Sequence, residues 1–198
     1  MSASERAMVY VVRHGETEWS RTGRHTGRSD VVLTPHGEEQ ASAIGQALAG
    51  ISFDTVLTSP LARAKETCRT AGYLGEAQEC EDLVEWDYGD YEGLTTDEIR
   101  RSVPGWTLFD HGVIGGESPA DVGRRVDRVI AALRERDGDS LCFAHAHVLR
   151  VFAARWLGLP PVGGKLLKLG PGSVSVLGWE REAPVISSWN QAPLLDVP

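Results

Sequence analysis

Short apolar segments alternate along this chain with longer amphipathic ones, and this alternation limits the possible folds more than any other feature. Four segments are typical of buried strands because each is a short run of mainly apolar residues: 8–12, 55–59, 140–144 and 173–179. Strands that alternate with helices indicate a largely parallel sheet covered by helices on both faces. In such sheets ligands bind beyond the carboxyl ends of the strands.

Recognisable helix starts lie between these apolar segments. Thr34, Ser59 and Ser118 each precede a proline, which is the pattern of a helix N-cap followed by a proline in the first turn. The helix that begins at Ser59 is predicted to run to about Ala71. A fourth helix is predicted over roughly residues 148–157, before a glycine and a proline. The sequence therefore predicts an α/β protein.

Length, composition and charge suit one globular domain. No linker or repeat divides the 198 residues, of which 41% are hydrophobic and 24% charged, so we expect a single domain over residues 1–198. The net charge of −8 argues against a general nucleic-acid binder, which would carry a basic face. It does not exclude an anionic ligand, because a pocket can be locally positive in an acidic protein.

The cysteines and the first apolar segment bear on the compartment. Cys68, Cys80 and Cys142 are odd in number and widely spaced, which indicates neither a disulfide framework nor a zinc site. The apolar run at 8–12 is too short for a membrane span or for the core of a signal peptide. We therefore expect a cytoplasmic protein that does not bind membranes.

Basic side chains are predicted to gather at one edge of the sheet. Arg13 and His14 follow the first apolar run, and His145 follows the run at 140–144. Arg63 lies in the first turn of a predicted helix, and helical side chains lean toward the helix N-terminus, so its guanidinium is expected over the same edge. A helix N-terminus also attracts anions. These groups together predict an anion site.

Two further sets of residues leave alternatives open. Glu85 and Asp87 are both candidates for an acid that protonates a leaving group, because they share one side of an extended segment. His145 and His147 stand two apart and suggest metal ligands, but nothing nearby in the sequence supplies a clear third ligand. We therefore expect no metal, and we expect His147 to have a structural or supporting role.

The order of several motifs resembles that of the histidine phosphatase, or phosphoglycerate-mutase-like, superfamily. These motifs are RHGETEW, LTPHGEEQA, SPLARAKETC, LVEWDYGDYEG, GGES and FAHAHVLR, and they cover most of residues 8–157. The likeness is greatest to the acid phosphatase and sugar-bisphosphatase branch. It implies a three-layer fold with a mostly parallel central sheet, and it implies no cofactor.

The resemblance implies roles for particular residues. His14 matches the nucleophile that becomes a phosphohistidine, Glu85 matches the proton donor, and Arg13, Arg63 and His145 match the groups that hold the phosphoryl group. A nucleophilic imidazole divides one difficult displacement into two easier ones, and guanidinium groups suit phosphate oxygens.

Further positions match residues that contact phosphate or substrate in relatives: Ser20, Thr26, Gly27, Tyr88 and Ala146. Ser20 replaces an asparagine that is common in the family, and Ala146 replaces a glycine. Alanine keeps the backbone N–H, so a phosphate contact at Ala146 requires a negative φ.

Three functions are compatible with these residues. The favoured one is a phosphatase of small phosphomonoesters, including sugar phosphates. A phosphoglycerate-type mutase is disfavoured because residues 93–118 offer only Arg100 and Arg101 as a basic insertion for a second phosphate. A binding module without catalysis is disfavoured by His14 and Glu85. Residues 105–116 are predicted to form a loop that closes over the substrate. Relatives are often dimers, so the resemblance leaves a homodimer open.

Overall fold

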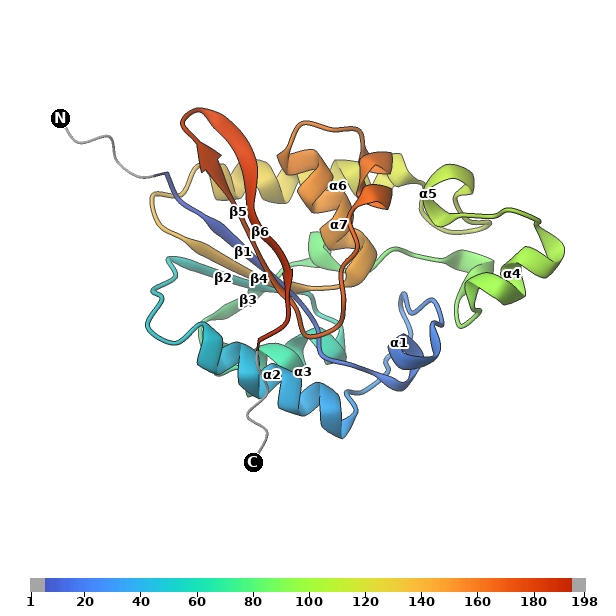
Figure 1. Ribbon diagram of the computed structural model, residues 1–198, viewed down its shortest axis with the longest axis horizontal. Helices are drawn as coiled ribbons and strands as arrows, with labels where there is room; N and C mark the ends of the chain where they lie inside the picture. Colours follow the sequence, from blue (N-terminus) through green and yellow to red (C-terminus); the bar gives the residue numbers. More distant parts are fainter. Residues whose placement is uncertain (1–5, 194–198) are drawn as a thin grey trace.

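A computed structural model of the chain, which describes residues 6–193, has a six-stranded sheet at its centre (Figure 1). The ends of the predicted domain, 1–5 and 194–198, lie outside the described residues. The strand order is β3-β2-β4-β1-β5-β6. The strands are β1 (Val9–Arg13), β2 (Thr55–Thr58), β3 (Ala77–Glu79), β4 (Ser140–Ala144), β5 (Val174–Glu180) and β6 (Ala183–Gln191).

The four strands at one side of the sheet are parallel. β1 pairs in parallel with β4, β4 with β2, and β2 with β3, while β5 and β6 are antiparallel to their neighbours. The prediction of a mostly parallel α/β sheet is confirmed. The strands β3 and β6 were not predicted because neither is a buried apolar run: both are mostly half-buried or exposed.

Helices cover both faces of the sheet, as predicted. Alternate residues of β1 point to opposite faces, so Val9 and Val11 join one apolar cluster and Val12 joins the other. α6 and α7 pack on the first face and α2 and α3 on the second, as Figure 1 shows. Their bounds are α2 (Pro35–Ala47), α3 (Ala62–Thr70), α6 (Pro119–Arg134) and α7 (Ala146–Trp156).

Two of the three predicted N-caps are confirmed. The hydroxyl groups of Thr34 and Ser118 accept N–H groups in the first turns of α2 and α6. The prediction for Ser59 is wrong: α3 begins at Ala62 with Leu61 as its N-cap, because the Ser59 hydroxyl lies 2.7 Å from a ring nitrogen of His145. The prediction for α7 places its start two residues too late.

Short helices and loops extend beyond the carboxyl ends of the parallel strands. Figure 1 shows α1, α4 and α5 gathered at this end of the sheet. The elements here are α1 (Glu18–Thr22), η1 (Glu81–Leu83), η2 (Gly89–Tyr91), α4 (Thr96–Ser102), α5 (Leu108–His111) and η3 (Pro161–Leu166). The predicted loop at 105–116 therefore contains a short helix. No helix in residues 6–193 has the length and apolar character needed to cross a membrane.

Candidate active site

His14 follows the carboxyl end of β1, at the edge of the sheet. The backbone N–H of His14 donates to the carbonyl of Ala144 on β4, at 3.0 Å, which fixes its position between two buried strands. Its Nδ1 lies 2.7 Å from the carbonyl oxygen of Gly15. A carbonyl only accepts hydrogen bonds, so Nδ1 carries the proton and Nε2 keeps its lone pair.

The surroundings of His14 keep its ring neutral. The residue is only 4% exposed, and burial, then the charges of Arg63 and Arg13, hold its pKa well below the ordinary value of 6.5. The imidazole is therefore neutral at neutral pH, with one proton on Nδ1 and none on Nε2. An unprotonated ring nitrogen is what a nucleophilic histidine requires.

Gly15 follows His14 for a steric reason. A Cβ at Gly15 would lie 2.3 Å from the carbonyl oxygen of Gly37, at the start of α2. Its φ is not in the left-handed range, so the need for glycine comes from the close approach of two backbones and not from an unusual turn.

Arg13, the residue before His14, has a buried guanidinium. Its Nη1 donates to the carbonyl of Leu169 at 2.5 Å, whereas its buried Nε has no hydrogen-bond partner within residues 6–193. Burial lowers the pKa of Arg13 to about 10, so the group is charged at neutral pH. A buried donor without a partner costs about 1–3 kcal/mol, which makes this nitrogen a good candidate for binding an anion.

A second histidine lies against the first. His145 follows β4, and its ring centroid is 5.2 Å from that of His14. The Nε of Arg63 donates to His145 Nδ1 at 3.1 Å, so the proton of this ring is on Nε2, which faces the Ser59 hydroxyl. Burial, and next the charge of Arg63, hold the pKa of His145 well below 6.5.

The remaining donors of Arg63 hold a loop. Nη1 donates to the carbonyl of Ser29 at 2.9 Å, and Nη2 donates to the carbonyls of Thr26 and Gly27 at 3.0 and 2.9 Å. Glu92 accepts the N–H groups of Gly27 and Ser29 from the same loop. Arg63 is therefore a buried brace between this loop and His145.

Glu85 is attached to the first turn of α7. Its carboxylate accepts the backbone N–H of Trp86 at 2.9 Å and the N–H groups of His147 and Val148 at 3.0 and 2.9 Å. It thus caps a helix whose own N-cap residue, His145, makes no side-chain capping bond. The carboxylate also lies 3.9 Å from the Nδ1 of His147.

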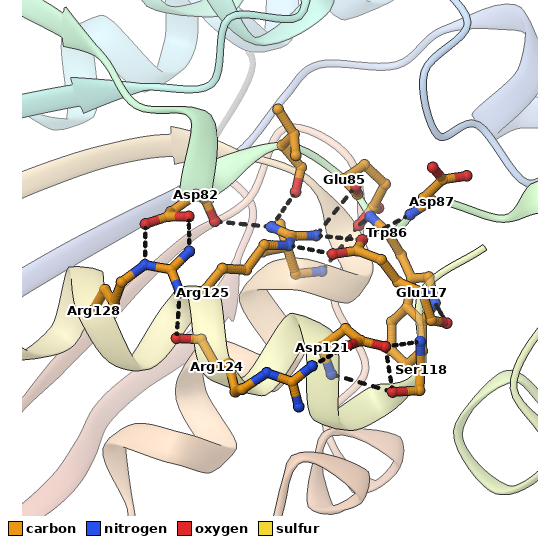
Figure 2. Close-up of polar contacts among 12 residues, drawn as sticks. Asp82, Glu85, Trp86, Asp87, Glu117, Ser118, Asp121, Arg124, Arg125 and Arg128 are labelled. Carbon is orange, nitrogen blue, oxygen red and sulfur yellow. Dashed lines mark hydrogen bonds and ion pairs between the residues drawn. The ribbon is translucent and has the colours of Figure 1, made fainter.

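A buried arginine on α6 holds the segment that carries Glu85. Arg125 donates to the carbonyls of Asp82 and Val84 at 2.8 and 2.7 Å. Figure 2 shows its side chain between Asp82 and Glu117. It also donates to the carbonyl of Glu85 at 3.2 Å and forms an ion pair with Glu117 at 2.8 Å. Five donor hydrogens in a planar fork suit such an array of oxygens.

His14 opens into a cavity of about 420 Å³. A second hollow shares part of its lining, including His25, His147 and Arg150, and extends the cavity toward Trp106 and Phe109. We call the His14 end the inner site. We call the side made by α7, η3 and the segment after η3 the outer wall: Arg150, Lys165, Leu166, Lys168 and Leu169.

The described residues around the cavity are strongly cationic. Its lining contains one carboxylate, that of Glu85, against five guanidinium and ammonium groups. Burial holds the pKa of His147 well below 6.5 and lowers that of His25 to about 4, so these rings are neutral. The cations are Arg13, Arg24, Arg150, Lys165 and Lys168.

Residues 9–192 match the model of the histidine phosphatase superfamily, branch 1. The chain belongs to this family. The resemblance seen in the motifs is therefore confirmed.

The chain is similar to proteins named as phosphatases and to others named as phosphoglycerate mutases, the latter at 31% identity over 194 residues. It is 41% identical over 177 residues to an acid phosphatase of Mycobacterium tuberculosis (strain ATCC 25618 / H37Rv), with 87% of each chain covered. It is 36% identical to sedoheptulose 1,7-bisphosphatase of Saccharomyces cerevisiae, covering 75% of this chain and 67% of the relative. The solved structure of open reading frame Rv3214 from Mycobacterium tuberculosis superposes with a TM-score of 0.90 at 37% identity, covering 95% and 99% of the two chains.

The predicted site residues of this chain fall into two layers. Those that line the cavity are Arg13, His14, Ser20, Thr26, Glu85, Tyr88 and Ala146. Arg63 and His145 are fully buried behind this layer, and the N–H of Gly27 is already bonded to Glu92. The predicted contact of Arg63, His145 and Gly27 with phosphate therefore stays a prediction.

Ser20 and Ala146, which depart from the family pattern, both line the cavity. Ser20 lies in the capping box of α1, where its hydroxyl donates to the carbonyl of Thr17. Ala146 begins α7, and its φ is negative, since the non-glycine residues with positive φ in residues 6–193 are Arg181 and Asn190. The geometric condition for an N–H contact at Ala146 is met.

The two candidate acids lie in different surroundings. Glu85 is 3% exposed and lines the cavity. Asp87 lies outside the lining, where it accepts the N–H of Gly89 and faces Arg28 at 3.9 Å. His147, which we expected to be a supporting residue, lies 2.6 Å from the hydroxyl of Tyr88. No group of three or more His, Cys, Asp or Glu side chains in residues 6–193 is arranged to hold a metal ion.

Several lining residues were not found by sequence reasoning. His25 lies in the loop after α1 and is buried, with its ring centroid 4.9 Å from that of Tyr88. Arg150 follows Ala146 by four residues, a spacing that places both on one face of a helix. Lys165 and Lys168 stand close together in a chain whose remaining lysine is Lys65. That clustering was the available signal for the outer wall.

Proposed function

We propose that this chain hydrolyses small phosphomonoesters, sugar phosphates among them, through a phosphohistidine on His14. The observation that carries the proposal is the neutral tautomer of His14, with its proton on Nδ1, in a cavity that it shares with Arg13 and Glu85. The phosphatase names of the relatives support the hydrolase class.

The first step transfers the phosphoryl group to the protein. His14 Nε2 donates its lone pair to phosphorus, the bond from phosphorus to the ester oxygen breaks, and Glu85 gives its proton to the leaving alkoxide. Arg13 binds the phosphoryl oxygens, and its buried Nε gains a partner in doing so.

The second step regenerates the histidine. A water oxygen bonds to phosphorus, the bond from phosphorus to Nε2 breaks, and the Glu85 carboxylate takes a proton from the water. Arg63 and His145 support this site from behind, since Arg63 holds the His145 ring that packs against His14.

A cytoplasmic location and a homodimer stay predictions from the sequence.

A phosphoryl-transfer experiment tests the proposal. Rapid mixing with p-nitrophenyl [³²P]phosphate and an alkaline quench is expected to give labelled protein that loses its label in acid, as phosphohistidine does. The variant His14→Asn is expected to give no label and to lose roughly 10⁴-fold or more in kcat/KM. Asp87→Asn is the matched control and is expected to keep its label.

Two outcomes would contradict the proposal. Wild-type protein that binds p-nitrophenyl phosphate but takes up no label would favour a binding module. Interconversion of 3-phosphoglycerate in a coupled assay at a rate far above phosphate release would favour a mutase.

A further inference from the structure

A second pocket lies at the other end of the sheet from His14. Its volume is about 400 Å³, close to that of the catalytic cavity, and the two share no lining residue. We call it the distal pocket. Its charged and aromatic lining consists of three arginines, two tryptophans and an aspartate: Arg6, Arg134, Arg136, Trp156, Trp179 and Asp137.

Four segments that are distant in the sequence meet at the distal pocket. Arg6 precedes β1, Arg134 is the last residue of α6, Trp156 is the last residue of α7, and Trp179 lies on β5. Figure 1 shows the start of β1 and the β5–β6 hairpin on the side away from α1, α4 and α5. The length of β1 places the pocket roughly 20 Å from His14, because an extended strand rises about 3.3 Å per residue.

The two tryptophans form a fixed floor. Trp156 is only 1% exposed, and its ring centroid lies 5.2 Å from that of Trp179. The Nε1 of Trp156 donates to the carbonyl of Gly178, and that of Trp179 donates to the carbonyl of Ala7, both at 3.2 Å. Both indole N–H groups have partners, so the rings are held in place before any ligand binds.

Two guanidinium groups stack on these rings. The Cζ of Arg6 lies 4.4 Å from the ring centroid of Trp179, and the Cζ of Arg134 lies 4.6 Å from that of Trp156. Arg134 also donates through Nη2 to the carbonyl of Trp156 at 2.9 Å. Stacking holds a guanidinium by its face and leaves the N–H groups at its edge directed outward, where they can bind an anion.

The positive charge of the distal pocket is not neutralised by ion pairs. Within residues 6–193, neither Arg6, Arg134 nor Arg136 forms a salt bridge, although the net charge of the chain is −8. Partial burial, and next the charge of Arg6, lower the pKa of Arg134. Cations that repel one another in this way are stabilised when an anion binds beside them.

We propose that the distal pocket binds a small organic phosphate, a dianion with an apolar body, at a site separate from the catalytic cavity. Three guanidiniums and one carboxylate leave an excess of two positive charges, and a phosphate monoester has a charge of about −1.5 to −2 at neutral pH. The edges of the guanidiniums suit its oxygens, and Leu133 with the rim of Trp179 suits its apolar body. The inference does not depend on the chemistry proposed for His14.

Phenylphosphonate is a suitable probe, because it is a dianion with an apolar ring and has no ester oxygen to be cleaved. Benzyl alcohol is its neutral counterpart. In a titration of ¹⁵N-labelled protein at low salt and about pH 8, we expect phenylphosphonate to shift the indole N–H signals of Trp156 and Trp179 with saturation. The expected Kd is about 1 mM or lower. Benzyl alcohol is expected to shift neither signal.

Variants of the lining assign the binding to the distal pocket. Arg136→Gln removes an exposed guanidinium and is expected to raise Kd at least fivefold. Arg134→Lys keeps the charge but loses the planar fork, and it should also raise Kd. Asp137→Asn removes the carboxylate and should lower Kd about twofold. Arg124→Gln is the control, since it removes the same charge from the start of α6, where Arg124 pairs with Asp121, and it is expected to keep Kd.

Several outcomes would overturn the inference. One is a shift of Trp106, which lies beside the catalytic cavity, without shifts of Trp156 and Trp179. Another is a response to benzyl alcohol as large as that to phenylphosphonate. A Kd that is unchanged in both Arg136→Gln and Arg134→Lys would place the probe elsewhere. The labelling experiment on His14 is independent of all three results, so the proposed function stands or fails separately.

Discussion

The inner site and the outer wall of the same cavity are built in opposite ways. At the inner site, His14, His145 and Glu85 are each almost fully buried. Glu85 and the Nδ1 of His14 bond to backbone groups, and His145 bonds to the side chains of Arg63 and Ser59. On the outer wall, Lys165 and Lys168 are exposed on a short 3-10 helix and the segment after it. The inner site is therefore held rigidly by hydrogen bonds, whereas the two lysines of the outer wall make few contacts.

The contrast corresponds to two chemical tasks. A displacement at phosphorus requires nucleophile, charge and acid in a fixed geometry, which buried strands and helix ends provide. Recognition of the rest of a substrate tolerates side chains that adjust. The inner site thus suits the chemistry that we propose for it, and the outer wall suits contact with the rest of a substrate.

The largest effect is expected from a change at the inner site. Arg13→Gln removes the guanidinium that we propose binds the phosphoryl group, and it is expected to lower kcat/KM by about 100-fold. The Arg13 charge also lowers the pKa of His14, so its removal raises that pKa. The acid limb of the pH–rate profile, where His14 becomes protonated, should therefore move to higher pH. A rate loss without this movement would show that Arg13 does not act on His14.

A smaller effect is expected from the support of Glu85. Arg125→Lys keeps the charge but loses the planar fork that holds three carbonyls, and kcat for a sugar phosphate should fall roughly tenfold. p-Nitrophenyl phosphate should be affected much less, because its leaving group needs no proton.

Arg124, the exposed neighbour of Arg125, supplies the control for the comparison of the two substrates. Arg124→Lys, at a position that pairs with Asp121 on the same helix, should leave both substrates unaffected (Figure 2). Equal losses on the two substrates in Arg125→Lys would indicate a general structural role in place of acid positioning.

The smallest effect is expected at the outer wall. Asp110→Asn removes a carboxylate that pairs with Lys165 beside the cavity, so KM for p-nitrophenyl phosphate is expected to fall about two- to threefold, with kcat unchanged. The midpoint of thermal unfolding should shift by less than about 2 °C, because both side chains are exposed. Asp127→Asn, which breaks the ion pair with Arg155 away from the cavity, is the control. A rise in KM in Asp110→Asn would contradict the prediction that Asp110 competes with the substrate for Lys165.

Sequence reasoning succeeded where local signals and tertiary structure agree. The apolar run that becomes β1 and the N-cap of α6 were predicted because burial and capping are local properties of those residues. Arg13, His14 and Glu85 were found because their motifs match the family, and all three line the cavity.

The failures have a common cause in contacts between distant segments. Ser59 has the sequence of an N-cap, but its hydroxyl meets His145, which lies 86 residues away, and α3 begins later. α7 begins earlier than predicted because Glu85 caps it from 62 and 63 residues away. His25, on which the sequence analysis made no prediction, is buried because Tyr88 and Trp106 pack against its ring.

The sequence by itself determined the alternation of strands and helices, the family, and the residues that carry the expected chemistry. It could do so because hydrophobic periodicity and motif order are written along the chain. The tertiary structure decided which of those residues line the cavity, which brace it from behind, and which cations face it from α7 and η3. These properties depend on segments that meet only after folding, since burial and hydrogen bonding assign each polar group its partner in space.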